Sequence, residues 1–161
     1  MTTQQTDMVA EMFPGPEGAK RLERFLGEWV VEGSLTMEGN AAPVAGHWSF
    51  VPAAAGWGLR SKFEGMIEGM GRADEDDLVG FDAETGLVHI YSLTNTGNVH
   101  DHVGDWTGAD TMEFVCETTQ GGAPYREVIT CDFTSPTSVT FHSTEHIGGE
   151  LASTFEANLR K

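Results

Sequence analysis

The sequence has few basic residues, few cysteines and no long apolar run, and each shortage excludes a class of function. Nine Lys and Arg stand against 25 Asp and Glu, so the net charge is -16 and nucleic acid and membrane surfaces are poor partners. Two cysteines do not make the disulfide framework of a small secreted domain. No segment approaches the roughly 20 apolar residues that span a bilayer. What remains is an acidic chain of 161 residues, enough for one domain with its own core.

The N-terminal segment, MTTQQTDMVAEMF, lacks the basic start and apolar stretch of a secretory signal, which predicts a cytoplasmic protein. Residues 1–12 are polar and unpatterned, and we expect a disordered tail there, followed by a single domain over residues 13–161. Cys116 and Cys131 have neither a CxxC nor a His-rich context, so both are predicted to be reduced packing residues.

Strand patterns recur along most of the chain. One amphipathic helix is predicted in EGAKRLERFLG, where Ala19, Leu22, Phe25 and Leu26 share a face. The predicted strands are Glu28–Met37, Val44–Pro52, Gly58–Gly69, Leu78–Phe81, Val88–Thr94, Val99–Trp106, Thr111–Thr118, Tyr125–Phe133, Ser138–His146 and Leu151–Arg160. Short Gly, Asn and Asp turns between them favour antiparallel neighbours. The fold class is therefore all-β, an antiparallel up-and-down barrel of about ten strands with one short N-terminal helix.

One segment interrupts this rhythm. Residues 70–77, MGRADEDD, are acidic and contain glycine, and we expect a mobile solvated loop at the barrel mouth.

Alternation along the strands predicts an inner surface that mixes aromatic residues with Gly and Ser, which leaves room for a ligand. The leading hypothesis is non-enzymatic binding of a small apolar or weakly polar molecule. Aromatic and Met side chains would supply contact area, Tyr91 and the histidines would orient the ligand, and Glu145 would be a buried acid. The candidate ligand-binding residues are Trp29, Trp48, Phe63, Tyr91, His100, His102, Met112, Phe114 and Glu145.

Two other functions stay open. The first is a pocket isomerase or cyclase in which His100, His102, Tyr91 or Glu145 transfers a proton. The second is a structural module with a filled barrel, able to form a homodimer through exposed strands. The sequence has no nucleophile elbow and no phosphate-binding loop. His100 and His102 share a strand face without an apparent third ligand, so neither a metal nor another cofactor is predicted.

Four segments carry a family resemblance. FLGEWVVEG (25–33), FEGMIEGMG (63–71), LVGFDAETGLVHIY (78–91) and the terminal STFEANLRK resemble the domain-of-unknown-function-1579 family. The resemblance covers about residues 18–161. Members are usually bacterial and are grouped with calycin-like β-barrels such as lipocalins. The resemblance implies a calycin-like barrel and implies no catalytic residues.

A second resemblance concerns haem. Nitrobindins begin with a similar Leu-Gly-x-Trp motif and end on a strand that resembles His-Leu-x-Ala-x-Leu-Arg, whose His binds the iron. The corresponding run here is Thr154–Arg160, with Thr154 in place of that His. A threonine hydroxyl is a poor haem ligand, so haem binding is the lesser alternative.

Overall fold

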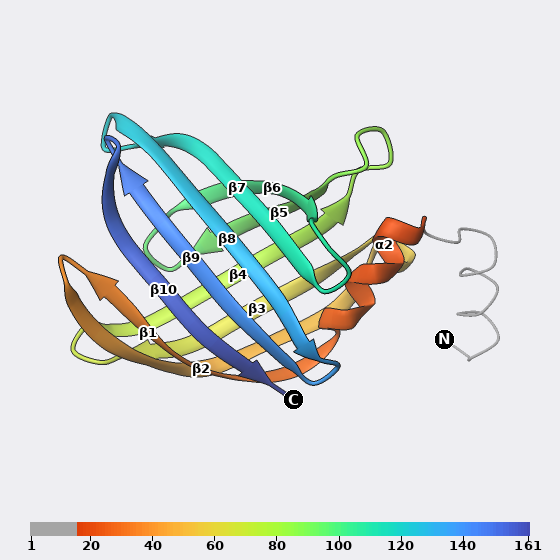
Figure 1. Ribbon diagram of the computed structural model, residues 1–161, viewed down its shortest axis with the longest axis horizontal. Coiled ribbons are helices and arrows are strands. Elements are labelled where there is room, and N and C mark those ends of the chain that lie inside the picture. The colour runs from red at the N-terminus through yellow and green to blue at the C-terminus, as the bar shows by residue number, and fades with distance from the viewer. Residues whose placement is uncertain (1–15) are drawn as a thin grey trace.

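Ten antiparallel strands form a closed barrel in the computed structural model, which describes residues 16–161. Each strand pairs with its neighbours in the sequence, and β1 closes the barrel against β10 (Figure 1). This confirms the predicted fold class, while the predicted tail (1–12) lies outside the described residues. The strands are β1 (Gly27–Met37), β2 (Asn40–Ala53), β3 (Gly58–Ile67), β4 (Gly71–Phe81), β5 (Val88–Thr94), β6 (Val99–Trp106), β7 (Thr111–Gln120), β8 (Ala123–Ser135), β9 (Ser138–Ile147) and β10 (Glu150–Arg160).

Tight turns join the strands because glycine adopts the left-handed backbone that such turns need. Gly148 and Gly149, between β9 and β10, have φ values of 62° and 90°. In β1 and β7 the buried residues alternate with exposed ones as the sequence predicts. This alternation places every second side chain inside the barrel.

The acidic segment 70–77 forms a strand, so its prediction as a mobile loop is wrong. Gly71–Phe81 pairs with β3 along nearly its whole length, from Gly71↔Ile67 to Gly80↔Gly58. Asp77 and Val79 are buried and point inward, while Asp76 and Leu78 are exposed. In β4 inward and outward residues alternate as in the other strands. The pattern is hard to recognise in the sequence because some of the inward residues are acidic.

A short helical segment closes one end of the barrel (Figure 1). It consists of α2 (Glu17–Arg21) and the 3-10 turn η1 (Leu22–Phe25), and a second 3-10 turn, η2 (Ala54–Gly56), joins β2 to β3. Leu22 and Phe25 are buried, and Trp29 Nε1 donates a hydrogen bond to the Phe25 carbonyl oxygen at 2.6 Å. Within residues 16–161 no helix has the length and apolarity needed to cross a membrane.

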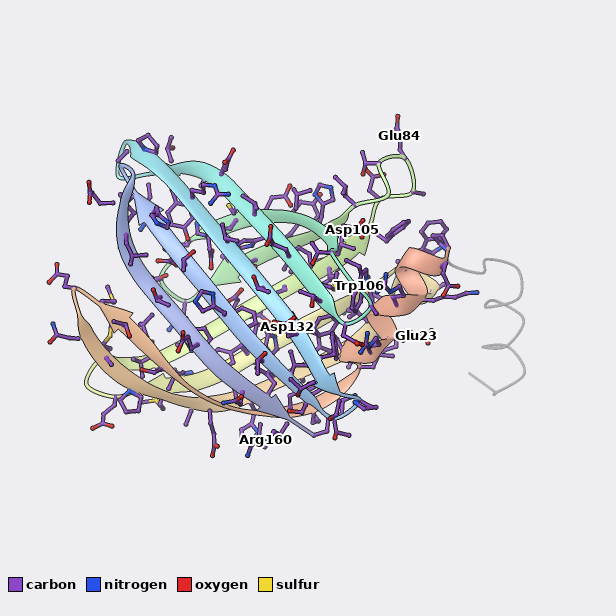
Figure 2. The ribbon with its side chains drawn as sticks, in the orientation of Figure 1. Glu23, Glu84, Asp105, Trp106, Asp132 and Arg160 are labelled. Carbon is purple, nitrogen blue, oxygen red and sulfur yellow. The ribbon has the colours of Figure 1, made fainter. Side chains whose placement is uncertain are left out.

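Arginines hold this segment against the turn between β6 and β7. Arg21 donates to the Gly108 carbonyl oxygen at 2.9 Å, and its guanidinium lies 4.0 Å from the centre of the Trp106 ring. Arg24 forms an ion pair with Asp110 at 2.8 Å. Figure 2 shows Trp106 beside the helix. The closed end of the barrel is therefore built from the helical segment and a strand turn together.

Leu151 lies on the outside of β10, although strict alternation with Ser153 and Phe155 would place it inside. The β9–β10 register shifts between Leu151 and Ser153, which marks a β-bulge. An extra residue reverses the alternation on one side of a bulge, and Leu151 is accordingly 60% exposed while Ser153 is buried.

Candidate functional site

The barrel encloses a cavity of about 310 Å³. It runs from Leu22 and Phe25 of η1, at the closed end, to the turn between β5 and β6, where Asn95 and Asn98 line it. This volume is at the lower limit for small-molecule sites, which span roughly 300–1,000 Å³. The barrel is therefore hollow enough for a compact ligand.

Aromatic side chains form much of the cavity wall. The Trp48 ring centre lies 5.7 Å from that of Phe63 and 5.5 Å from that of Phe141, and Phe155 lies 5.7 Å from Phe141. Edge-to-face and tilted rings at such separations are stable arrangements. Trp48 Nε1 is buried and has no hydrogen-bond partner among the described residues. The apolar wall thus carries one free donor.

A carboxyl pair, half-buried Glu75 and buried Asp77, lines the cavity from β4. Ser61 of β3 donates a hydrogen bond to Asp77 Oδ2 at 2.5 Å. Burial raises the pKa of Glu75 well above its ordinary value, and the negative charge of Asp77 adds to this effect. Asp77 Oδ1 is buried and has no hydrogen-bond partner among the described residues.

A histidine cluster, defined as His100, His102, Cys116 and Glu127, lies on β6, β7 and β8. His102 Nε2 and Glu127 Oε2 are 2.7 Å apart, and His100 Nδ1 is 3.8 Å from the same oxygen. Burial alone would raise the pKa of Glu127, but its bond with His102 brings that pKa below its ordinary value. Burial and the nearby His102 lower the pKa of His100, which keeps this ring neutral. Glu127 is thus an ionised carboxylate held by a histidine inside the barrel.

Tyr125 lies beside the histidine cluster, and Glu145 adds a further carboxyl to the cavity wall. Tyr125 donates to Glu127 Oε2 at 3.0 Å, and burial together with the Glu127 charge raises the pKa of its phenol. Glu145 accepts a hydrogen bond from Ser153 at 2.8 Å. Among the described residues that line the cavity there is no lysine or arginine, whereas Glu75, Asp77, Glu127 and Glu145 all line it. The cavity therefore favours cationic over anionic groups.

Six of the predicted site residues lie on the cavity wall. These are Trp48, Phe63, His100, His102, Phe114 and Glu145. The structure places both histidines, His100 and His102, inside the barrel.

The other three predicted site residues, Trp29, Tyr91 and Met112, do not line this cavity. Tyr91 is 50% exposed on the outside of β5, where it stacks on His89. Its inner neighbours are Ile90 and Ser92, and strand alternation turns Tyr91 outward. Trp29 and Met112 are fully buried in the packed core, where Trp29 supports η1.

The sequence reasoning missed three carboxylates that line the cavity. Glu127 lies on the same inward face of β8 as the apolar residues Ile129 and Cys131, and this shared face was the available signal. Glu75 and Asp77 likewise share a strand face with the apolar residue Val79. The many charged residues around them nevertheless indicated a loop. A carboxylate in phase with buried apolar residues was the informative pattern in both strands.

Comparisons with known proteins show the fold of this chain. No family model matches it and no curated protein matches it, so the resemblance to the domain-of-unknown-function-1579 family stays a prediction. Rv2717c from M. tuberculosis is similar with a TM-score of 0.68 at 13% identity, over 91% of this chain and 98% of that chain. The S-type phycobiliprotein lyase CPES from Guillardia theta is similar with a TM-score of 0.55 at 15% identity, over 88% and 90%. At these identities the likeness establishes a shared barrel fold.

Thr154 bears on the haem alternative. It alternates on β10 with Ser153 and Phe155, and of these residues Phe155 lines the cavity while Ser153 is buried. Thr154 therefore occupies the outer face of the strand and offers nothing to an iron inside the barrel.

Proposed function

We propose that this protein binds one small, mostly apolar molecule inside its barrel. The cavity carries this proposal, because its wall combines Trp48, Phe63 and Phe141 with a few convergent polar groups. That composition is typical of ligand sites, in which apolar contact supplies affinity and polar groups set orientation. A phycobiliprotein lyase shares the barrel fold.

The polar groups favour a ligand with a protonated amine or another donor-rich end. Asp77 Oδ1 and Ser92 Oγ are buried on the wall without partners among the described residues. A ligand N–H group would satisfy the carboxylate oxygen, and an ammonium would compensate its charge. Aromatic faces such as Trp48 also attract cations. This refines the predicted weakly polar ligand towards a cationic one.

A neutral fluorophore tests whether the barrel cavity binds an apolar molecule. Phenylnaphthylamine should bind the full-length protein saturably at one molecule per chain, with increased emission. Ser143→Phe should weaken binding by about tenfold or more, because Ser143 is buried on the wall between Ile129 and Phe155 and a phenyl ring there occupies the cavity.

The matched control is His142→Phe, which places the same ring on the outer face of the same strand, where His142 is 46% exposed. This variant should bind the fluorophore like the natural protein, and both variants should keep their melting temperatures. Equal loss in the two variants, or no saturable binding by the natural protein, would overturn the proposal.

Three naphthalene probes of similar size test the charge preference. Naphthylmethylamine, naphthylmethanol and naphthoate present a cation, a neutral hydroxyl and an anion on the same ring. The amine should bind about tenfold more tightly than the alcohol, equivalent to about 1.4 kcal/mol, and the carboxylate most weakly. Equal affinities for the three probes would refute the preference for cations, but would not contradict binding of an apolar molecule in the barrel.

Acid–base catalysis on the bound ligand is a second candidate, and the buried pair His102 and Glu127 favours it. The two groups are 2.7 Å apart on the cavity wall and form a base held by a carboxylate. If the protein is an isomerase or cyclase, His102→Asn and Glu127→Gln should abolish turnover of a bound metabolite while its affinity changes little. Loss of binding alone would favour the container.

A further inference from the structure

We propose that His100, His102 and Cys116 form a binding site for a zinc-class divalent ion on the cavity wall. Their ligand atoms lie within 4.8 Å of one another. His100 and His102 come from β6, and the register Val103↔Val115 brings Cys116 of β7 beside His102. The sequence showed two histidines without a third ligand, and the barrel supplies that ligand from the next strand.

The spacing is close to that of a bound ion. Zn–N bonds of about 2.0–2.1 Å and Zn–S bonds of about 2.3 Å place tetrahedral ligand atoms about 3.3 to 3.6 Å apart. The widest gap therefore has to close by roughly 1 Å, which small rotations of three side chains achieve. Cys116 and His102 are 2% and 3% exposed, so the ligands are held by the packed barrel.

Glu127 positions one of the ligands. His102 Nε2 is 2.7 Å from Glu127 Oε2, and a proton on Nε2 leaves the Nδ1 lone pair free. Nδ1 is buried and has no partner among the described residues. A metal-binding histidine almost always donates its other N–H to a carboxylate or carbonyl, and this pair has that arrangement.

The ligand chemistry selects the ion. Two imidazoles and a thiolate favour zinc and related transition metals over magnesium and calcium, which prefer oxygen. On binding, the Cys116 thiol loses its proton to solvent and the sulfur coordinates as thiolate. Three protein ligands leave a fourth position, and His100 and His102 both line the cavity. The ion would therefore face whatever the cavity holds.

Titration of the metal-free full-length protein with Zn²⁺ and Co²⁺ tests the site. We expect one ion per chain, no competition from Mg²⁺, and a thiolate-to-cobalt charge-transfer band in the near ultraviolet. This spectrum is measured on the natural protein, so the test does not depend on any variant folding. A cobalt complex without the thiolate band would overturn the proposal.

Two cysteines in one barrel provide a matched pair of variants. Cys116→Ser should remove the charge-transfer band. It should also weaken zinc binding by more than the ~10–100-fold that is typical when a residue hydrogen-bonded to a metal ligand is lost. Cys131→Ser should change neither, because Cys131 is also buried on the cavity wall but belongs to no cluster of metal-ligating atoms among the described residues. Equal effects of the two substitutions would overturn the assignment.

Glu127→Gln separates positioning from coordination. It should weaken zinc binding by about 10–100-fold and keep the thiolate band, because Cys116 still binds the ion. Glu117→Gln, on the exposed side of β7, should leave zinc affinity unchanged. If Glu127→Gln has no effect on affinity, the positioning role of Glu127 is wrong. Phenylnaphthylamine binding is measured in parallel, so failure of the metal site and failure of the container are distinguishable.

Discussion

Replacing Glu75 by Gln should make the protein more stable, and the gain should grow with pH. Glu75 lies on the cavity wall beside Asp77, and burial followed by the Asp77 charge raises the pKa of its carboxyl well above 4.5. A glutamine side chain keeps the size and can donate its amide N–H to Asp77 without ever becoming charged.

The magnitude follows from proton linkage. Below about pH 4.5, the ordinary pKa of this carboxyl, Glu75 is protonated in both the folded and the unfolded chain. Above it, the unfolded chain releases the proton and the folded chain keeps it. Each further pH unit then lowers the free energy of unfolding by about 1.4 kcal/mol, until the pH reaches the folded-state pKa. The Glu75→Gln variant lacks this pH dependence. The difference in free energy of unfolding between the variant and the natural protein therefore grows by about 1.4 kcal/mol per pH unit.

Urea unfolding at a series of pH values from 5 upward measures this difference. With an m value of about 1–3 kcal/mol/M, the midpoint of the variant should move away from that of the natural protein by about 0.5 to 1.4 M per pH unit. Asp76→Asn is the matched control, because Asp76 is the exposed neighbour on the same strand and does not line the cavity. A constant offset for Glu75→Gln would refute the carboxyl pair.

Three further substitutions and one control test the barrel. Gly104→Ala should destabilise the protein by about 1–3 kcal/mol, because a Cβ there would lie 2.0 Å from a backbone oxygen of β7; Gly108→Ala, with open space around it, should be neutral in urea unfolding. Trp29→Ala should cost about 3–5 kcal/mol in the same assay, since the indole is fully buried and holds Phe25 by a hydrogen bond. Tyr91→Ser should leave phenylnaphthylamine affinity unchanged, because Tyr91 lies outside the barrel; a loss would contradict its placement.

Strand positions were predictable wherever alternation and turn residues agree. β5 and β6 begin and end at the predicted residues, because Asn-Thr-Gly at 95–97 ends one strand and starts the next. The inner placement of Trp48 and Phe63 followed from the same period of two. Local spacing carries this information, so no knowledge of neighbouring strands was needed.

The polar wall could not be predicted to the same degree. Glu75 and Asp77 lie inside only because the sheet closes into a barrel, and closure is not a local property of β4. Cys116 becomes a candidate ligand only through the pairing of β6 with β7, which joins residues from separate strands. The outward position of Leu151 could not be predicted for a related reason, since a bulge adds a residue without a distinct signature.

A crystal of the protein pressurised with xenon tests the hollow barrel most directly. Xenon occupies apolar cavities that protein atoms leave unfilled. We expect its density inside the barrel among Trp48, Phe63 and Phe141, the aromatic part of the cavity wall. A barrel whose side chains fill this space, with no xenon density among the three rings, would contradict the proposed container.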